Sequence, residues 1–415
     1  MDIIATNDEY FDKLEKSVSI ELGKIGPTLI KERLEEIDKL LFDKRPYWLI
    51  PIRFDKRRIL TLSGYVEFKR RYYFDSREKI YTHLLDSIVG IPRRGKLSAS
   101  FRLKLARMAS EMTYSKATRW APFWEEGTVS RSTVCRSLKA LSIVTESGPI
   151  ELGNGKIHVQ VDEKYAKIIG RRNKSRIYTA TIFTGKKNGK LVGRTLLRAF
   201  SSISIYKAID ETLRERYGVS TNDDIYLSGD LAPYIRHGGE SILSCKAQYV
   251  PDKWHVKESL MKELGLLVSD KEMARGRFIK SISDALEGSP SEDGKKLSRL
   301  IKENPSCFSH WRDKRYLGCC QEGMNSHYYA PRLAKLPGAG FSRENASKIL
   351  LLTLAEANGE KIRLGIRQQY DWIPDIGPNP LGDYMRQRYD IDASQYPRWI
   401  RDTILKIEYG GDEGI

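Results

Sequence analysis

A change of pattern at residue 157 limits what this chain can fold into. From Ile157 to Asp162, apolar and polar residues alternate, which predicts a half-buried strand. Asn188-Gly189, the strongest short hairpin signal, separates two further strand-like runs. A helix and two more strands follow. The predicted series is Ile157–Asp162, Arg176–Thr184, Leu191–Phe200, helix Ser204–Tyr217, Asp224–Asp230 and Cys245–Val250.

This order of elements is the order of a ribonuclease-H-like fold. It predicts a mixed α+β or α/β catalytic core, in which hairpin-linked strands are followed by strands joined through helices. Apolar residues at three- and four-residue steps predict further helices downstream. These helices are expected at about 254–266, 270–286, 293–303 and 342–357.

The part of the chain before residue 150 has a different character. Residues 8–42 have helical periodicity, and residues 47–75 predict a basic hairpin that turns at Ser63-Gly64. Consecutive short helices then resemble a helix-turn-helix, in which Ser130 is expected to cap the last helix. These helices are Ser98–Met112, Tyr114–Trp124 and Ser130–Leu141, with a turn at Glu125–Gly127.

The charge of the chain favours a polyanionic partner. Its 415 residues include 71 lysines and arginines against 54 acidic residues, a net charge of +17. Between residues 51 and 120 there are 17 basic and 6 acidic residues. A basic face of this kind binds a phosphate backbone or is simply solvated, and the net charge favours DNA. The candidate DNA contacts are Lys69, Arg70 and Arg71 in the hairpin and Arg131, Ser132 and Arg136 on the last short helix.

Several protein classes are excluded. No apolar run approaches the roughly 18 residues of a membrane span, and the first residues are too acidic for a signal peptide. Five cysteines without a CxxC pair argue against a disulfide scaffold or a zinc ribbon. We therefore expect a soluble cytoplasmic protein without a membrane partner.

Three acidic residues are candidate metal ligands. Asp162 and Asp230 end two predicted strands, and parallel neighbouring strands would bring both carboxylates to one edge of the sheet. Two such charges repel each other, and a divalent cation between them offsets this repulsion. Glu322, an isolated acid in a neutral segment, is the expected third ligand. Carboxylate oxygens suit two Mg²⁺ or Mn²⁺ ions, which together serve phosphoryl transfer.

Each of these residues also has a simpler interpretation. A lone aspartate at a strand end often caps a turn. Three roles are open for His255, just after the fifth strand: contact with a phosphate, assistance in proton transfer, or a structural hydrogen bond within the loop. The same three roles are open for His327.

At these positions the chain resembles the ISLre-type (ISLre-two) insertion-sequence transposases, a group long classed as an uncharacterised protein family and distantly similar to Mutator-like transposases. The resemblance covers about residues 50–357, and the Glu-Gly-x-x-x-His block is its most specific part. The core motifs are VQVDEKYAKI (159–168), YLSGDLAPYI (226–235), VPDKWHVKESL (250–260) and CCQEGMNSHYYAPRLAKLPGAGFS (319–342). The upstream motifs are RRILTLSGYVEFKRRYYF (57–74), HLLDSIVGIPRRGKLS (83–98) and GTVSRSTVCRSL (127–138).

The resemblance implies a DDE transposase that binds the terminal inverted repeats of its element as an oligomer and then cleaves and transfers strands with Mg²⁺ or Mn²⁺. It assigns the three acids to Asp162, Asp230 and Glu322, and it gives Asp252 and His255 of a D-x-x-H motif an auxiliary role. Together with the patterns above, this gives five predicted domains: 1–46 (helical), 47–97 (basic, β-rich), 98–150 (helix-turn-helix), 151–357 (catalytic, with a helical insertion at about 254–317) and 358–415 (basic tail).

Two other functions remain open. A ribonuclease-H-like nuclease or resolvase would use the same acids without strand transfer. A transposase-derived protein that has lost catalysis would only bind DNA. An active transposase would be associated with the nucleoid.

Overall fold

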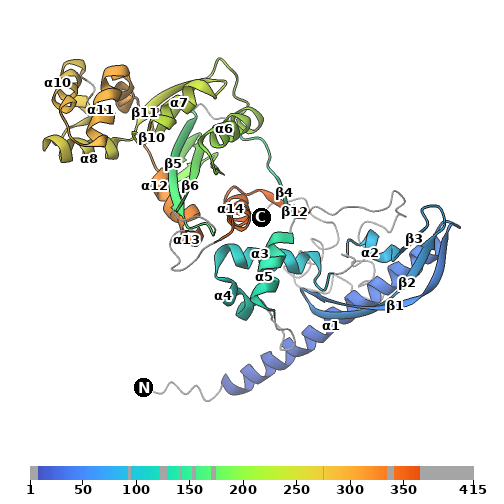
Figure 1. Cartoon of the computed structure of the whole chain (residues 1–415). Coiled ribbons are helices and arrows are strands. Elements are labelled where there is room, and N and C mark those ends of the chain that lie inside the picture. The colour runs from blue at the N-terminus through green and yellow to red at the C-terminus, as the bar shows by residue number, and fades with distance from the viewer. Residues whose placement is uncertain are drawn as a thin grey trace, which may run out of the picture. The chain divides into compact units, whose positions relative to one another are not determined.

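The computed structural model describes residues 8–91, 95–121, 129–140, 143–151, 156–169, 174–273, 275–333 and 341–364 of the chain (Figure 1). The chain divides into two compact units. Unit 1 comprises residues 1–105, 118–133 and 365–415, and unit 2 comprises residues 106–117 and 134–364. Within the described residues no helix combines the length and the apolar character needed to cross a bilayer.

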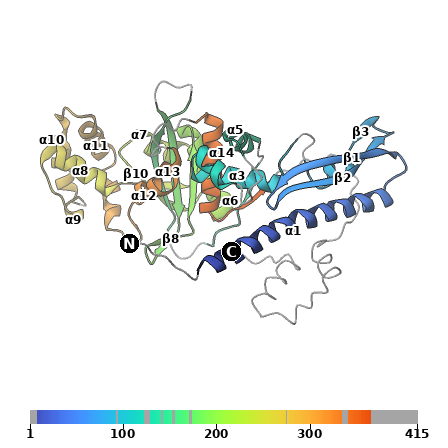
Figure 2. The same cartoon turned by 90° about the horizontal axis from the view of Figure 1, so that it is seen from below.

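Unit 1 contains the predicted N-terminal helix and the predicted hairpin. Helix α1 (Asp8–Asp43) runs along the antiparallel strands β1 (Leu49–Thr61) and β2 (Gly64–Asp75) (Figure 2). The short strand β3 (Ile80–Thr82) extends this sheet, and helix α2 (Leu84–Ile88) follows it. Both the helix and the hairpin predictions are confirmed.

Apolar residues of α1, β1, β2 and α2 form the core of unit 1. The buried members are Leu34, Ile37, Leu41, Leu49, Ile59, Val66, Phe68, Tyr73, Leu84 and Leu85. Carboxylates of α1 also cover the free edge of β2, because Glu35 and Asp38 accept hydrogen bonds from the backbone N–H groups of Lys69 and Arg71. An edge strand whose N–H groups are satisfied in this way is protected from pairing with another chain.

Three short helices follow where the helix-turn-helix is predicted. They are α3 (Ala99–Glu111), α4 (Tyr114–Trp120) and α5 (Arg131–Ala140). The hydroxyl of Ser130 accepts a hydrogen bond from the Thr133 N–H at 3.1 Å, which confirms the predicted N-cap. The predicted turn Glu125–Gly127 lies outside the described residues.

A five-stranded mixed sheet organises unit 2. Its spatial order is β11-β10-β5-β6-β9. Strand β5 is parallel to β10, which is parallel to β11, while β6 is antiparallel to both β5 and β9. The strands are β5 (His158–Ala166), β6 (Ser175–Phe183), β9 (Thr195–Ala199), β10 (Asp224–Gly229) and β11 (Lys246–Pro251).

The predicted series of strands is confirmed, with two differences. The strand expected to end at Asp162 continues to Ala166, because residues 162–166 pair with β6. The run expected as a single strand, Leu191–Phe200, is divided between β9 and a small hairpin of β7 (Gly185–Lys187) and β8 (Lys190–Val192). Asn188 and Gly189 both have positive φ, as a two-residue hairpin turn requires. Gly193, at φ 57°, lies at the break between β8 and β9.

Helices cover both faces of this sheet. Helix α6 (Ser202–Tyr217) packs on β6 and β9, and α7 (Pro233–Ser241) packs on β10 and β11. Helix α12 (Gln321–Met324) contacts β5 and β6. It continues through a π-helical turn, η2 (Asn325–Tyr329), into α13 (Ala330–Leu333). Helix α14 (Arg343–Ala357) contacts β9, and the strands β4 (Ile143–Glu146) and β12 (Lys361–Leu364) pair antiparallel.

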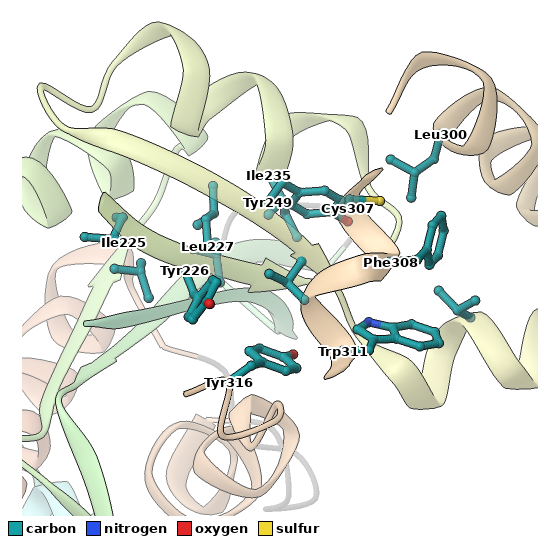
Figure 3. Packing of buried hydrophobic residues seen from close by; sticks show 14 of the residues in the cluster. Ile225, Tyr226, Leu227, Ile235, Tyr249, Leu300, Cys307, Phe308, Trp311 and Tyr316 are labelled. Atoms are coloured by element: carbon teal, nitrogen blue, oxygen red, sulfur yellow. The ribbon is translucent and has the colours of Figure 1, made fainter. Parts of the chain in front are cut away.

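The predicted helical insertion is present between β11 and α12. It contains α8 (Lys253–Leu264), α9 (Asp270–Met273), α10 (Gly276–Glu287), α11 (Glu292–Glu303) and the 3₁₀ helix η1 (Pro305–Arg312). The helix expected at 270–286 is therefore two helices. Figure 3 shows the apolar contact between the insertion and the sheet, in which Cys307, Phe308 and Trp311 of η1 pack near Tyr249 of β11 and Leu300 of α11.

Candidate active site

Three aspartates lie in one row where the parallel strands end. Ser228 of β10 pairs with Gln160 of β5 and with Val250 of β11. Two residues beyond these partners stand Asp230, Asp162 and Asp252, respectively. Residues at equal positions of parallel strands are neighbours, so the backbone positions of the three aspartates lie in one row across the sheet, although β5 itself continues past Asp162 to Ala166. The sequence predicted this neighbourhood for Asp162 and Asp230.

The Asp162 carboxyl is in a partly buried environment. Burial raises the pKa of Asp162, and the nearby charge of Asp230 raises it further. A hydrogen bond from the Glu163 backbone N–H and the charges of Lys164 and His255 act in the opposite direction. Two acids that interact in this way gain stability from a cation between them.

Asn325 holds one oxygen of the Asp162 carboxylate. Its side-chain Nδ2 donates to Asp162 Oδ2, and its own Oδ1 accepts a hydrogen bond from the Thr179 hydroxyl at 2.8 Å. The Gln321 amide in turn donates to Thr179 Oγ1 at 3.0 Å. Asn325 and Thr179 are fully buried and Gln321 nearly so, so this polar chain is rigid and fixes the orientation of the catalytic candidate Asp162.

The segment before α12 crosses the same face of the sheet. Gln160 donates from Nε2 to the Gly318 carbonyl oxygen at 2.7 Å and accepts from the Cys320 N–H at 2.8 Å. Burial raises the pKa of the Cys319 thiol, and the charge of Asp252 beside it raises that pKa further. Residues 318–320 therefore lie beside both Asp252 and Gln160.

This covering segment corrects the expectation of a half-buried strand. Gln160 and His158 are polar, yet both are buried, because residues 315–325 pack over the side of β5 that alternation assigned to solvent. A segment that lies more than 150 residues away in sequence leaves no trace in the local pattern of β5.

The two auxiliary candidates of the D-x-x-H motif lie at this edge. Asp252 caps α8 by accepting a hydrogen bond from the Trp254 N–H at 2.7 Å, and its own N–H donates to the Gly229 carbonyl oxygen at 2.9 Å. His255 is partly buried on the first turn of α8 and close enough to influence Asp162. His327, the other candidate histidine, is exposed on η2.

Glu322 occupies the first turn of α12, next to the residues that bind Asp162. Its neighbour Gln321 is buried, whereas Glu322 is exposed. Among the described residues, no three or more His, Cys, Asp and Glu side chains lie close enough together to hold a metal ion.

The donors at the edge nevertheless fit Mg²⁺ or Mn²⁺ in kind. Asp162 and Asp230 offer oxygen atoms only, and each carboxylate oxygen of Asp162 accepts one hydrogen bond, which leaves a second lone pair. The charge of Asp230 raises the pKa of Asp162, and a divalent cation between the two carboxylates would offset this repulsion.

The candidate DNA contacts in the hairpin have different surroundings. Arg70 is 5% exposed, and its guanidinium lies beside Asp86 of α2. Burial lowers the pKa of Arg70 to about 10. Arg71 forms an ion pair with Asp38 of α1 at 2.6 Å, whereas the Lys69 side chain is exposed. Arg70 and Arg71 thus contribute to the packing of unit 1, and Lys69 faces solvent.

The candidates on α5 are all at the surface. Arg131, Ser132 and Arg136 are exposed, while Val134 and Leu138 on the same helix are buried. This helix is therefore amphipathic, with the three candidates outside its buried face.

The sequence did not reveal Gln160, Thr179, Gln321 and Asn325 as site residues. Their signal was weak, because neutral polar residues within a strand or a short helix are ordinary. The one available hint was Asn325 in the Glu-Gly-x-x-x-His block, three residues after Glu322.

Comparison with known proteins gives a family. The model of an uncharacterised protein family, UPF0236, matches residues 4–369. A UPF0236 protein of Caldanaerobacter subterraneus subsp. tengcongensis, whose name covers eleven gene loci, is 25% identical over 94% of this chain and 84% of its own length. A UPF0236 protein from the vanSb 3′ region of Streptococcus gallolyticus is 24% identical over 86% of this chain and 85% of its own length. The chain therefore belongs to the uncharacterised protein family UPF0236.

Proposed function

We propose that this protein is a DDE transposase of an insertion sequence, which cleaves and transfers DNA strands with the help of Mg²⁺ or Mn²⁺. The observation that carries the proposal is the row of Asp162, Asp230 and Asp252 at the carboxyl edge of three parallel strands. Metal-dependent phosphoryl transfer requires several carboxylates at one point. Two of the three aspartates also cap backbone groups, because Asp230 accepts a hydrogen bond from the Ala232 N–H at 2.9 Å and Asp252 caps α8.

The strand order supports a ribonuclease-H-like core. Three successive antiparallel strands, β5, β6 and β9, are followed by β10 and β11, which add in parallel on the other side of β5. This is the arrangement expected for that fold. It places the first strand in the middle of the sheet, where Asp162 has neighbours on both sides.

The distribution of the family supports a mobile element. One protein name covers eleven loci of a single genome, and another covers four loci of the same genome. Copies of one protein at many loci are typical of a sequence that moves within its genome. The motifs shared with ISLre-type transposases agree with this interpretation.

In this proposal, each residue of the candidate site has a separate role. Asp162, oriented by Asn325, and Asp230 would hold the metal ions, and Glu322 is the proposed third ligand. When bound, the ions would polarise the scissile phosphodiester and activate the attacking oxygen. His255, whose charge acts on the pKa of Asp162, would contact a phosphate near the reacting group. The partners would be the terminal repeats and target DNA, held by an oligomer at the nucleoid.

A nuclease without strand transfer and an inactive DNA-binding protein remain the alternatives. The first would use the same acids and leave only cut ends. The second would bind DNA through its positive charge alone. Product analysis separates all three functions.

The test is a nicking and strand-transfer assay on duplex DNA that carries the flanks of this gene, with Mn²⁺ or Mg²⁺. We expect wild type to cut the DNA and join the cut end to a second duplex. Asp162→Asn and Asp230→Asn should each lose at least about 100-fold in rate, because a metal ligand is removed while the side-chain shape is kept. Glu211→Gln, an exposed acid on α6, is the matched control and should retain full activity.

Two further variants, Glu322→Gln and Asp252→Asn, identify the third acid. If only Glu322→Gln loses cleavage activity, Glu322 is the third metal ligand, as proposed. If only Asp252→Asn loses it, Asp252 is the third ligand instead. Cutting without joining would establish the nuclease, and binding without cutting in wild type would establish the inactive protein. Full activity in both Asp162→Asn and Asp230→Asn would overturn the site itself.

A further inference from the structure

One face of the β1–β2 hairpin gathers basic and aromatic side chains. The pairing of the strands sets Phe54 opposite Arg71, Lys56 opposite Lys69, Arg58 opposite Glu67 and Leu60 opposite Tyr65. Alternate residues of a strand share a face, so these positions lie on one side of the hairpin. We call its exposed members the ribbon face: Phe54, Lys56, Arg58, Tyr65, Glu67 and Lys69.

The pairing of Lys56 with Lys69 is unfavourable in the free protein. Side chains directly opposite each other on one face lie about 5 Å apart at Cβ, and like charges at that spacing destabilise a sheet. Both lysines are exposed, and within the part of the chain that the structure describes neither ammonium forms an ion pair. Glu67, the acid of the ribbon face, stands opposite Arg58 instead. An anion placed between the two lysines would remove their repulsion.

The aromatic residues of the ribbon face are already covered by cations. The Arg58 guanidinium lies 4.2 Å from the ring centroid of Tyr65, and the Arg71 guanidinium lies 4.8 Å from that of Phe54. A ring covered by a guanidinium has one face fewer to offer to a nucleic-acid base. Stacking on aromatic rings is the main mode of single-strand binding, so this arrangement favours the phosphate backbone of a duplex.

The dimensions of the hairpin suit a duplex. Strands β1 and β2 pair over about a dozen residues, or about 40 Å, which is close to one turn of B-DNA. A two-stranded ribbon also fits the major groove. We propose that the ribbon face binds the backbone of duplex DNA, with one phosphate held between Lys56 and Lys69. This inference rests on the proposed function only in taking DNA as the partner.

The test uses the full chain and a fluorescently labelled duplex of about 30 base pairs, with anisotropy measured at several salt concentrations. Lys56→Gln with Lys69→Gln should weaken binding about tenfold at moderate salt. It should also make the slope of log affinity against log salt shallower by about 2, because each of the two lysines no longer neutralises phosphate charge. Lys262→Gln with Lys280→Gln removes the same charge from exposed positions of α8 and α10 and should leave that slope unchanged.

Thermal unfolding separates binding from folding. Because Lys56 and Lys69 repel each other, the double variant should melt at the wild-type temperature or above it. Equal salt slopes for the two double variants would overturn the proposal. The same measurement is made with single-stranded DNA of the same length and with duplex RNA. If the Lys56/Lys69 double variant loses affinity for one of these but not for duplex DNA, the assignment of duplex DNA is wrong.

The outcome is independent of catalysis. Glu211→Gln, which lies outside both the candidate site and the ribbon face, should bind the duplex with wild-type affinity and salt slope. If wild type binds through the ribbon face but cuts no DNA, the proposed function fails and this inference stands. If wild type cuts DNA and the Lys56/Lys69 variant binds like wild type, the inference fails and the function stands.

Discussion

The imidazole of His158 is buried among the aromatic rings of Phe183, Tyr226 and Tyr316. Its Nε2 donates to the Arg315 carbonyl oxygen at 3.0 Å, which leaves Nδ1 as an unprotonated nitrogen without a hydrogen-bond partner in the described part of the chain. Burial is the largest cause that lowers the pKa of His158, to about 4. The folded chain therefore needs this histidine to be neutral.

A dependence of stability on pH follows from this burial. The histidine of the unfolded chain binds a proton near pH 6.5, whereas that of the folded chain binds it only near pH 4. The unfolded state thus holds more protons between these values, and the free energy of unfolding falls as pH decreases from 6.5 to 4. The stability from the neutral ring is complete above pH 6.5, and on the order of 3 kcal/mol is lost by pH 4.

His158→Phe keeps the stacking on Phe183 and removes the titration. Urea unfolding at pH 7 and pH 5 should show a smaller loss of stability for the variant than for wild type, by about 2 kcal/mol. His237→Phe, at a position 60% exposed, is the control and should behave as wild type does. An equal loss in His158→Phe and wild type would show that His158 does not cause the effect.

Elements pack closely where α6 crosses α7. A Cβ atom on Gly238 would lie 2.1 Å from the Tyr206 ring, and the Tyr206 hydroxyl donates to the Ile235 carbonyl oxygen at 2.7 Å. The absence of a side chain at Gly238 thus permits the helix contact that supports α7, and α7 begins three residues after Asp230.

Gly238→Ala should therefore destabilise unit 2 by about 1–3 kcal/mol, although alanine is otherwise the better helix former. Thermal unfolding measures this change. Gly288→Ala, at a position where an added Cβ meets nothing within 4 Å, is the matched control and should be neutral. Equal melting temperatures for the two variants would show that α6 and α7 adjust without cost.

Local patterns were sufficient to predict most elements, because hairpin turns, caps and periodicity act over a few residues. The strand that contains Asp162 and the cap at Ser130 are examples, although that strand continues to Ala166. Interactions between distant segments left no such signal. The burial of Gln160 by residues 318–320 and the ion pair of Arg71 with α1 both depend on chain segments far away in sequence.

At the scale of the whole molecule, the candidate site depends on residues from across unit 2. Asp162 comes from the first strand of the sheet, Asp230 and Asp252 follow the two strands that add beside it, and Asn325 arrives from beyond the helical insertion. The closeness of Asp162 and Asp230 was predictable, because both follow runs that predict neighbouring parallel strands, although β5 continues past Asp162 to Ala166. The support from Asn325 was not, because the insertion separates it from the strands.

The most direct test of the account is the number of Mn²⁺ ions that the full chain binds, measured by electron paramagnetic resonance with a duplex present. We expect two ions per chain in wild type and in Glu211→Gln, and the loss of at least one ion in Asp162→Asn and in Asp230→Asn. Equal stoichiometry and affinity in all four proteins would show that the edge of β5 and β10 is not a metal site, and would contradict the account.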